Sequence, residues 1–280
     1  MRAVATTRAK TRAAAWCAAV ATLAGGCSGG ARSVRETAPQ TMPETMPEPM
    51  PESMPESMRA EAWSAVSTRV RIDRARQAVA FDATAVISEG FLEQYVCTVG
   101  TREHESLFAF EGKSSEIHAA LLLAGFQPGT PGRWREVPDA NGAVTLERVP
   151  PAGDEISAQV RLPSGEAHPL DWFVRASPVA PHAADAAPPS RLVFGGSRFI
   201  TSRKTQQEFY AADASGSLIG LVTFGDETIG AVEVIPDQVE ASPAVWEVFV
   251  ERMPPPGTKV TIVLAPGRAA RVPKSSEIKR

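Results

Sequence analysis

The sequence predicts an α+β domain of mostly antiparallel β-sheet with one short helix, preceded by a disordered N-terminal region. Short runs of alternating apolar residues recur along the chain, and 21 glycines and 24 prolines are spread among them. Such spacing is typical of antiparallel strands joined by turns. Only residues 115–124 have a clear helical period. We expect the folded part to span residues 62–273, which is long enough for one domain with a sizeable core.

Segments rich in aromatic and β-branched residues mark the expected strands. Near the start of the folded part we expect strands at Ala78–Ile87, Phe91–Val99 and Ser106–Phe110. Residues 213–217 are expected to form the turn of a β-hairpin, because Gly216 can adopt a positive φ. The other expected strands are short, and they lie near Val144–Leu146, Ile156–Leu162, Leu170–Val174, Arg191–Phe194, Glu208–Ala212, Leu218–Phe224 and Thr258–Leu264.

The expected helix spans about Ser115–Ala124. Ser114 or Ser115 can cap its N-terminus with a hydroxyl, and Gly125 is suited to end it. Its apolar positions recur with helical spacing. They form the face that we expect to be buried, which consists of Ile117, Ala120, Leu121 and Ala124.

Residues 1–26 have the organisation of a lipoprotein signal peptide. A positively charged start is followed by an apolar run, and small residues precede Cys27. The run is too short to span a bilayer, which takes about 20 apolar residues. Cys27 is therefore the expected lipidation site. Leu23 lies one position further from the cysteine than in the commonest lipoprotein pattern, so an ordinary secretory signal cleaved near Gly26 or Gly30 is the alternative.

An acylated Cys27 would anchor an exported protein to a membrane of the cell envelope, on the periplasmic face. By similarity to Gram-negative lipoproteins, Ser28 at the next position favours the outer membrane. Loss of the four cations in the leader would lower the net charge from −3 to −7. An acidic protein lacks the basic face that nucleic acids require, and anionic lipid would not attract it. We expect a membrane contact through lipid, a partner that is an envelope protein or a small molecule, and no nucleic acid.

Residues 27–61 are expected to form a disordered tether. A tetrapeptide of the form Met-Pro-Glu-x occurs four times in tandem over residues 42–57. Proline at every fourth position is incompatible with a helix or a central strand. We also expect a mobile Ala/Pro-rich loop at 177–190 and a frayed tail at 274–280.

Only Cys97 would remain in the folded part, because Cys17 is removed with the leader and Cys27 is acylated. No intramolecular disulfide can then form. Cys97 lies beside Tyr95 and Val96, and these neighbours favour a buried, unreactive thiol over a reactive one.

His104, Glu105, Ser106 and His118 form the candidate binding site. A strand and a helix packed side by side would bring the two imidazoles together, and two histidines with a carboxylate can bind zinc or another divalent metal. On an alternating strand, however, Glu105 would point away from His104. The alternative is that His104 and Glu105 hydrogen-bond to neighbouring backbone and that His118 lies on the flank of the helix near Leu122. No catalytic residue is assigned, since Ser106 lacks the glycine-flanked turn that exposes a serine nucleophile.

Two further features have both a ligand-binding and a structural interpretation. The segment Gly195-Gly196-Ser197 is similar to a phosphate loop, but no Walker lysine follows it, so the alternative is a bulge or sharp turn. Trp134, Trp172 and Trp246 either line a ligand groove or belong to the core.

Several segments occur together in an order that is characteristic of one family. They are Arg102–Leu107, Glu116–Leu122, Gly125–Gly129, Asp171–Phe173, Val193–Ser197, Tyr210–Asp213 with Gly216, and Pro254–Thr258. Together they resemble the YdjY domain family, which is common in exported planctomycete proteins, and the resemblance covers most of residues 91–266. It implies a fold and an exported setting rather than an activity. Some members are described as ferredoxin-like, but an iron–sulfur cluster needs about four thiolates, and Cys97 is a single one.

Two functional hypotheses follow. In the first, the chain is a lipid-anchored envelope protein whose YdjY-like domain binds a ligand or a partner without catalysis or a cofactor. In the second, it is a metal-dependent hydrolase or redox accessory that uses His104, His118 and Glu105, with zinc or another divalent metal as the cofactor.

Overall fold

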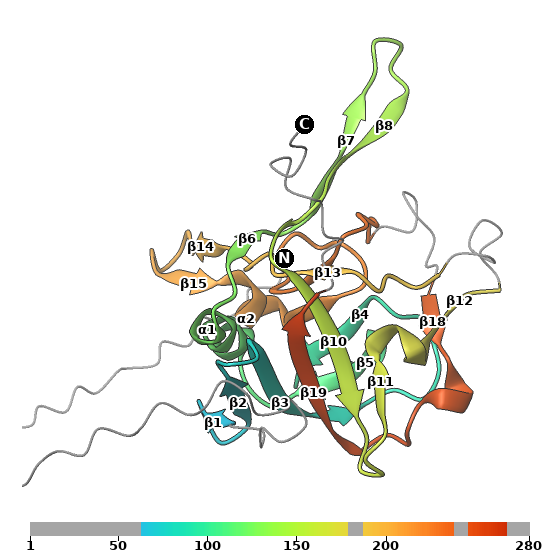
Figure 1. Cartoon of the computed structure of the whole chain (residues 1–280). Helices are drawn as coiled ribbons and strands as arrows, with labels where there is room; N and C mark the ends of the chain where they lie inside the picture. Colours follow the sequence, from blue (N-terminus) through green and yellow to red (C-terminus); the bar gives the residue numbers. More distant parts are fainter. Residues whose placement is uncertain (1–62, 179–186, 238–245, 268–280) are drawn as a thin grey trace, which may run out of the picture. The chain divides into compact units, whose positions relative to one another are not determined.

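The computed structural model describes residues 63–178, 187–237 and 246–267 of the 280-residue chain (Figure 1). The expected signal peptide, Cys27, the Met-Pro-Glu repeats and the tail lie outside the described residues. The same is true of residues 179–186 in the Ala/Pro-rich loop, whereas Ser177 is buried and the carbonyl of Pro189 accepts a hydrogen bond from the Tyr95 hydroxyl. No helix of the described part is long and apolar enough to cross a membrane.

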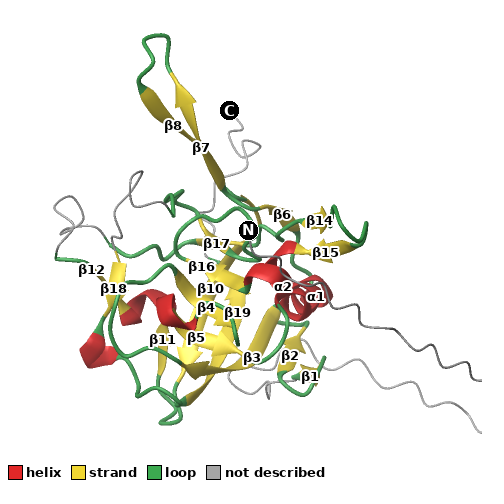
Figure 2. Cartoon of the chain, turned by 180° about the vertical axis from the view of Figure 1, so that it is seen from behind, coloured by secondary structure: helices red, strands yellow, loops and turns green. Residues whose placement is uncertain are grey.

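The domain is built around one main sheet, as Figures 1 and 2 show. Its strands follow the order β16-β4-β5-β3-β19-β10-β13-β17, with β2 also paired to β3, β1 to β2 and β11 to β10. The pairs are antiparallel except for β4–β5, which is parallel. The strands are β1 (Ser64–Ala65), β2 (Val70–Asp73), β3 (Ala78–Ala85), β4 (Gln94–Thr98), β5 (Ser106–Phe110), β10 (Glu155–Arg161), β11 (Ala167–Pro169), β13 (Leu192–Val193), β16 (Ser217–Gly220), β17 (Gly230–Ala231) and β19 (Lys259–Pro266).

The two ends of the main sheet approach each other, so the sheet is nearly closed like a barrel. Ile219 of β16 forms a parallel bridge with Ile229, which directly precedes β17. The N–H of Gly220 donates to the carbonyl of Ile229, and the N–H of Ile229 donates to the carbonyl of Leu218. These bonds satisfy backbone groups that an open sheet edge would leave unpaired.

Four smaller antiparallel pairs surround the main sheet. The hairpin of β7 and β8 projects away from the rest of the domain in both views (Figures 1 and 2). The pairs are β6 (Pro128–Thr130) with β9 (Ala152–Gly153), β7 (Arg133–Pro138) with β8 (Val144–Val149), β12 (Val174–Ala176) with β18 (Trp246–Val248), and β14 (Phe199–Thr201) with β15 (Glu208–Tyr210). The helices are α1 (Ser114–Ala124) and α2 (Ala211–Ser215), with 3₁₀ turns η2 (Glu103–Glu105), η3 (Leu170–Phe173) and η4 (Val250–Arg252).

The core lies between the main sheet and α1. Phe81 of β3 and Phe110 of β5 are fully buried and meet edge to face, with ring centroids 5.3 Å apart. From the helix, Ile117 and Leu121 are also fully buried. Each such side chain contributes roughly 1.5–3 kcal/mol when removed from water. This packing holds α1 against β2 and β3 and thereby places the residues on its other faces.

The α+β prediction is confirmed in part, since the domain is mostly antiparallel β-sheet with few helices. Helix α1 begins one residue earlier than expected, its predicted apolar face is buried, and Gly125 ends it with a φ of +99°. The predicted serine cap is wrong, because Lys113 occupies the N-cap and Ser114 is already helical. Instead, the carboxylate of Asp213 on α2 accepts bonds from the N–H and the hydroxyl of Ser115, at 2.8 and 2.7 Å.

Two predicted elements differ from the structure. Residues 213–217 do not form a hairpin turn, because residues 211–215 form α2 and Gly216 ends that helix with a φ of +80°. The preceding strand β15 pairs with β14 and not with β16. Residues 170–174 are not a strand, because 170–173 form the turn η3, and β12 starts only at Val174.

Candidate functional site

His104 lies in the turn η2 that precedes β5, so the strand alternation considered for residues 104–106 does not apply to it. Its side chain is 77% exposed, and its Nε2 lies 3.5 Å from a carboxylate oxygen of Glu105. Glu105 also pairs with the guanidinium of Arg102 at 2.9 Å. His104 is therefore a surface side chain beside an ion pair.

Ser106, at the start of β5, is fully buried. Its hydroxyl donates to the carbonyl of Arg102 at 2.6 Å, which closes the turn η2 onto the strand. Cys97 on the neighbouring strand β4 is a free, fully buried thiol, and burial raises its pKa. Cys97 is thus buried, as its neighbours in the sequence favoured, and Ser106 has a backbone partner that the sequence did not predict.

His118 lies in a different environment, on the side of α1 that faces a buried polar network. Its Nδ1 is 2.9 Å from the hydroxyl of Tyr210, and its ring meets the Phe194 ring edge to face with centroids 5.0 Å apart. Burial lowers the pKa of His118, which favours the neutral imidazole. The Tyr210 hydroxyl also donates to the carbonyl of Gly196 at 2.9 Å and lies 3.1 Å from the hydroxyl of Thr228.

The structure thus places His104 and His118 among different partners. Within the described residues, no group of three or more His, Cys, Asp and Glu side chains has an arrangement that could hold a metal ion. The network around His118 joins α1, β15 and the segment 194–197, so it connects three of the family segments. Its role in the described contacts is to hold these elements together.

A second charged cluster joins β4 to η2. The Arg102 guanidinium lies between Glu105, at 2.9 Å, and Glu93, at 3.7 Å, and it covers the ring of Phe224 at 4.0 Å from the centroid. Burial and the neighbouring carboxylate of Glu105 raise the pKa of Glu93 from 4.5 to about 7. Arg102 therefore contacts both the ring of Phe224 and the carboxyl group of Glu93, whose pKa is about 7.

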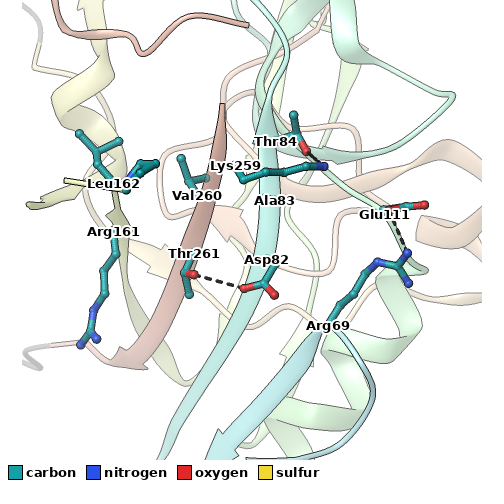
Figure 3. Close-up of a pocket in the computed structure, with 11 residues that line it drawn as sticks. Arg69, Asp82, Ala83, Thr84, Glu111, Arg161, Leu162, Lys259, Val260 and Thr261 are labelled. Atoms are coloured by element: carbon teal, nitrogen blue, oxygen red, sulfur yellow. Dashed lines mark hydrogen bonds and ion pairs between the residues drawn. The ribbon is translucent and has the colours of Figure 1, made fainter. Parts of the chain in front are cut away.

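A groove crosses the outer face of the main sheet, over β3, β19 and the end of β10 (Figure 3). It encloses about 510 Å³. Arg69 pairs with Glu111 at 2.9 Å, Lys259 donates to the hydroxyl of Thr84 at 2.8 Å, and the Thr261 hydroxyl bonds to Asp82 at 3.2 Å. Charges of both signs lie along this groove, with Arg69, Arg161 and Lys259 lining it together with Asp82 and Glu111.

A second cavity of about 510 Å³, which we call the hairpin-base cavity, lies where the β7–β8 hairpin leaves the domain. It has two arginines, two aromatic side chains and three glycine or proline residues, and its lining residues include no aspartate or glutamate. The lining consists of Thr130, Pro131, Gly132, Arg133, Trp134, Ser197, Arg198, Phe224 and Gly225.

The hairpin-base cavity combines side chains from three separate segments, which hydrogen bonds fix in place. The indole Nε1 of Trp134 donates to the carbonyl of Thr223 at 3.2 Å. The hydroxyl of Ser197 donates to the carbonyl of Asp226 at 2.5 Å and accepts from the N–H of Ala212 at 3.2 Å. Ser197 has a φ of +54°, a conformation that non-glycine residues seldom adopt and that occurs preferentially at functional sites.

The sequence identified parts of this cavity but not the cavity itself. Ser197 and Trp134 were both considered as ligand contacts, and both line it. Of the other tryptophans, Trp246 is buried in the core and Trp172 is 39% exposed under the guanidinium of Arg252. The two arginines gave no sequence signal, because Arg133 and Arg198 lie far apart in the chain.

Comparison with known proteins gives one match. The sequence model of the YdjY domain family matches residues 70–265, which is more than half of the chain. The matched residues include the main sheet from β2 to β19. No curated protein and no solved structure shows significant similarity. The order of the segments and this match lead to the same conclusion, namely that the chain belongs to the YdjY domain family.

Proposed function

We propose that this chain is an exported, lipid-anchored protein of the cell envelope whose YdjY domain is a non-enzymatic binding module. The leader of residues 1–26 and Cys27 support the anchor, and the Met-Pro-Glu repeats support a tether between membrane and domain. Ser28 favours the outer membrane. The acyl chains would be the main membrane contact, each contributing about 0.8 kcal/mol per buried methylene group.

The binding role depends on one observation, the hairpin-base cavity. Its volume of about 510 Å³ falls within the range of pockets that hold small molecules, roughly 300–1,000 Å³. Aromatic and charged side chains converge on it from segments that are far apart in the sequence. The alternative of a metal-dependent hydrolase or redox accessory finds no such support, because His104 and His118 have separate partners.

Lipid attachment is tested by growing cells that express the full chain with labelled palmitate. The wild-type chain should incorporate label and sediment with the outer membrane, and Cys27→Ser should do neither. Cys17→Ser is the matched control, because it removes a cysteine of the leader and leaves Cys27 intact. Retention of label by the Cys27→Ser chain would refute the anchor.

Binding is tested by placing a photo-reactive benzoylphenylalanine at Thr130, an exposed residue of the hairpin-base cavity. Illumination of intact cells should give an adduct, detected as a mass increase of the chain. The same amino acid at Thr145, which is exposed on β8 and lines neither the hairpin-base cavity nor the groove, is the control. The binding proposal fails if Thr130 gives no more adduct than Thr145.

A further inference from the structure

We propose that the hairpin-base cavity binds an organic oxyanion, a ligand that joins a carboxylate or phosphate group to a flat apolar body. This inference rests on the proposed binding function and names its ligand class. It depends on the charge, the aromatic lining and the backbone of the cavity.

The charge of the cavity is positive and uncompensated. Arg133 and Arg198 both line it, and both are exposed. Among the described residues, neither guanidinium has an ion-pair partner, whereas Arg135 on the same hairpin pairs with Glu147. Guanidinium groups bind carboxylates and phosphates through paired, planar hydrogen bonds. Two free guanidinium groups in a chain of net charge −3 therefore select an oxyanion.

The aromatic lining favours a flat apolar body next to that anion. The indole of Trp134 uses its N–H on the carbonyl of Thr223, so the ring is held in one orientation. Phe224 is likewise held by the Arg102 guanidinium over its ring. Aromatic rings pack on such surfaces with a preference for offset or edge-to-face geometry. An inorganic anion alone would leave these two rings without a contact.

The backbone around the cavity is already shaped for close approach. Gly196 and Ser197 both have positive φ, at +83° and +54°, and the hydroxyl of Ser197 bonds on both sides of the turn. A Cβ on Gly195 would lie 2.9 Å from the Cα of Pro131, so glycine allows these two walls to touch. A lining that is held in place before binding loses less entropy when a ligand arrives.

The groove in Figure 3 serves as an internal control, since its volume is the same but its charges are mixed. Asp82 and Glu111 line it together with Arg69, Arg161 and Lys259. An oxyanion there would meet carboxylates as well as cations. An organic oxyanion should therefore bind in the hairpin-base cavity and not in the groove of Figure 3, although the two have the same volume.

The test is saturation-transfer NMR on the full chain in detergent micelles, with empty micelles as the blank. Phenyl phosphate and phenylacetate are the oxyanion probes, and they distinguish a phosphate from a carboxylate. Three control probes each change one feature: benzyl alcohol lacks the charge, benzylamine reverses it, and methyl phosphate keeps the anion but lacks the ring. At least one oxyanion probe should bind more tightly than all three of these.

Arg133→Ala and Arg198→Ala should each weaken binding of that probe about threefold to fivefold, as expected for one exposed charge interaction. Lys259→Ala, in the Figure 3 groove, should leave it unchanged. Because these side chains are exposed, the variants should fold, and their thermal unfolding checks this. The inference is overturned if benzylamine binds as tightly as the oxyanion probe, or if Lys259→Ala weakens binding of that probe. It is also overturned if neither oxyanion probe binds at about 10 mM. If these probes fail while Thr130 gives adducts, the ligand class is wrong and the binding function stands.

Discussion

The hydroxyl of Tyr210 lies 2.9 Å from Nδ1 of His118 and donates its hydrogen to the carbonyl of Gly196, also at 2.9 Å. A neutral His118 with its hydrogen on Nδ1 would donate to this hydroxyl. A tyrosine of β15, a histidine of α1 and the glycine-rich segment at 195–197 are thus held by one phenol group. The segment so held contains Ser197 and leads to Arg198, which both line the hairpin-base cavity.

Tyr210→Phe should lower the free energy of unfolding by about 1–3 kcal/mol, because it leaves the partners of the hydroxyl unsatisfied in a buried site. Urea unfolding measures this loss. His104→Ala is the control, since its side chain is 77% exposed and the change should stay within about 0.5 kcal/mol. Equal effects of the two substitutions would contradict the structural role of the Tyr210 network.

Glu227 predicts a pH dependence of stability. Its side chain is buried, and burial raises its pKa from 4.5 to about 7, although the N–H groups of Gly225 and Asp226 bond to its carboxylate. The folded state therefore binds the proton more tightly than the unfolded state does. The resulting stabilisation is complete below about pH 4.5 and is lost as the pH rises through about 7.

Between pH 5 and 8 the wild-type chain should lose more stability than Glu227→Gln, whose amide cannot ionise. The difference has an upper limit of about 3 kcal/mol. Chemical unfolding at a series of pH values measures it. Glu93→Gln gives a second comparison, with a smaller effect because Glu93 is partly exposed and close to Arg102. Parallel pH profiles for wild type and Glu227→Gln would rule out the raised pKa.

Gly153→Ala should destabilise the domain by several kcal/mol. A Cβ at this position would lie 2.1 Å from the carbonyl oxygen of Phe194, and the φ of +138° is one that other residues rarely adopt. Gly142→Ala is the matched control, because its φ is +82° but no atom lies within 4 Å of the added Cβ. That control should cost about 1 kcal/mol, and thermal unfolding compares the two. A similar cost at both positions would show that the close contact at Gly153 is absent.

Thiol labelling tests the buried cysteine together with the proposed processing. In the mature protein Cys17 would be removed and Cys27 acylated, and Cys97 is fully buried with a raised pKa. The folded mature protein should therefore react with no thiol reagent, and denaturation should expose one thiol. Labelling of the native protein would mean that Cys97 is accessible or that Cys27 is free, and peptide mapping tells these apart.

The parts of the fold that depend on local patterns could be predicted. The face of α1 around Ile117 and Leu121 follows from helical spacing, and Ser106–Phe110 coincides with β5. Gly216 was assigned a positive φ but the wrong turn, because a glycine in this conformation ends a helix as readily as it closes a hairpin. An alternating pattern of side chains at residues 104–106 could not show that His104 and Glu105 belong to the turn η2, which ends at Glu105.

The site could be predicted only in part, because it depends on contacts between distant segments. Ser115 bonds to Asp213, 98 positions away, in place of the expected local cap. Arg133 and Arg198 come together at one cavity although no sequence spacing relates them. For Trp134 and Ser197 the sequence leaves a ligand contact and a structural role as alternatives, and the structure places both in the lining of this cavity.

The most direct measurement of the central claim is hydrogen–deuterium exchange of the full chain with and without whichever of phenyl phosphate and phenylacetate binds more tightly. The ligand should slow exchange in residues 130–134, 196–198 and 223–226, which border the hairpin-base cavity, and leave 82–84 and 259–261 in the other groove unchanged. Protection confined to the second pair of segments, or no protection in the first three, would contradict the assignment of this cavity as the binding site.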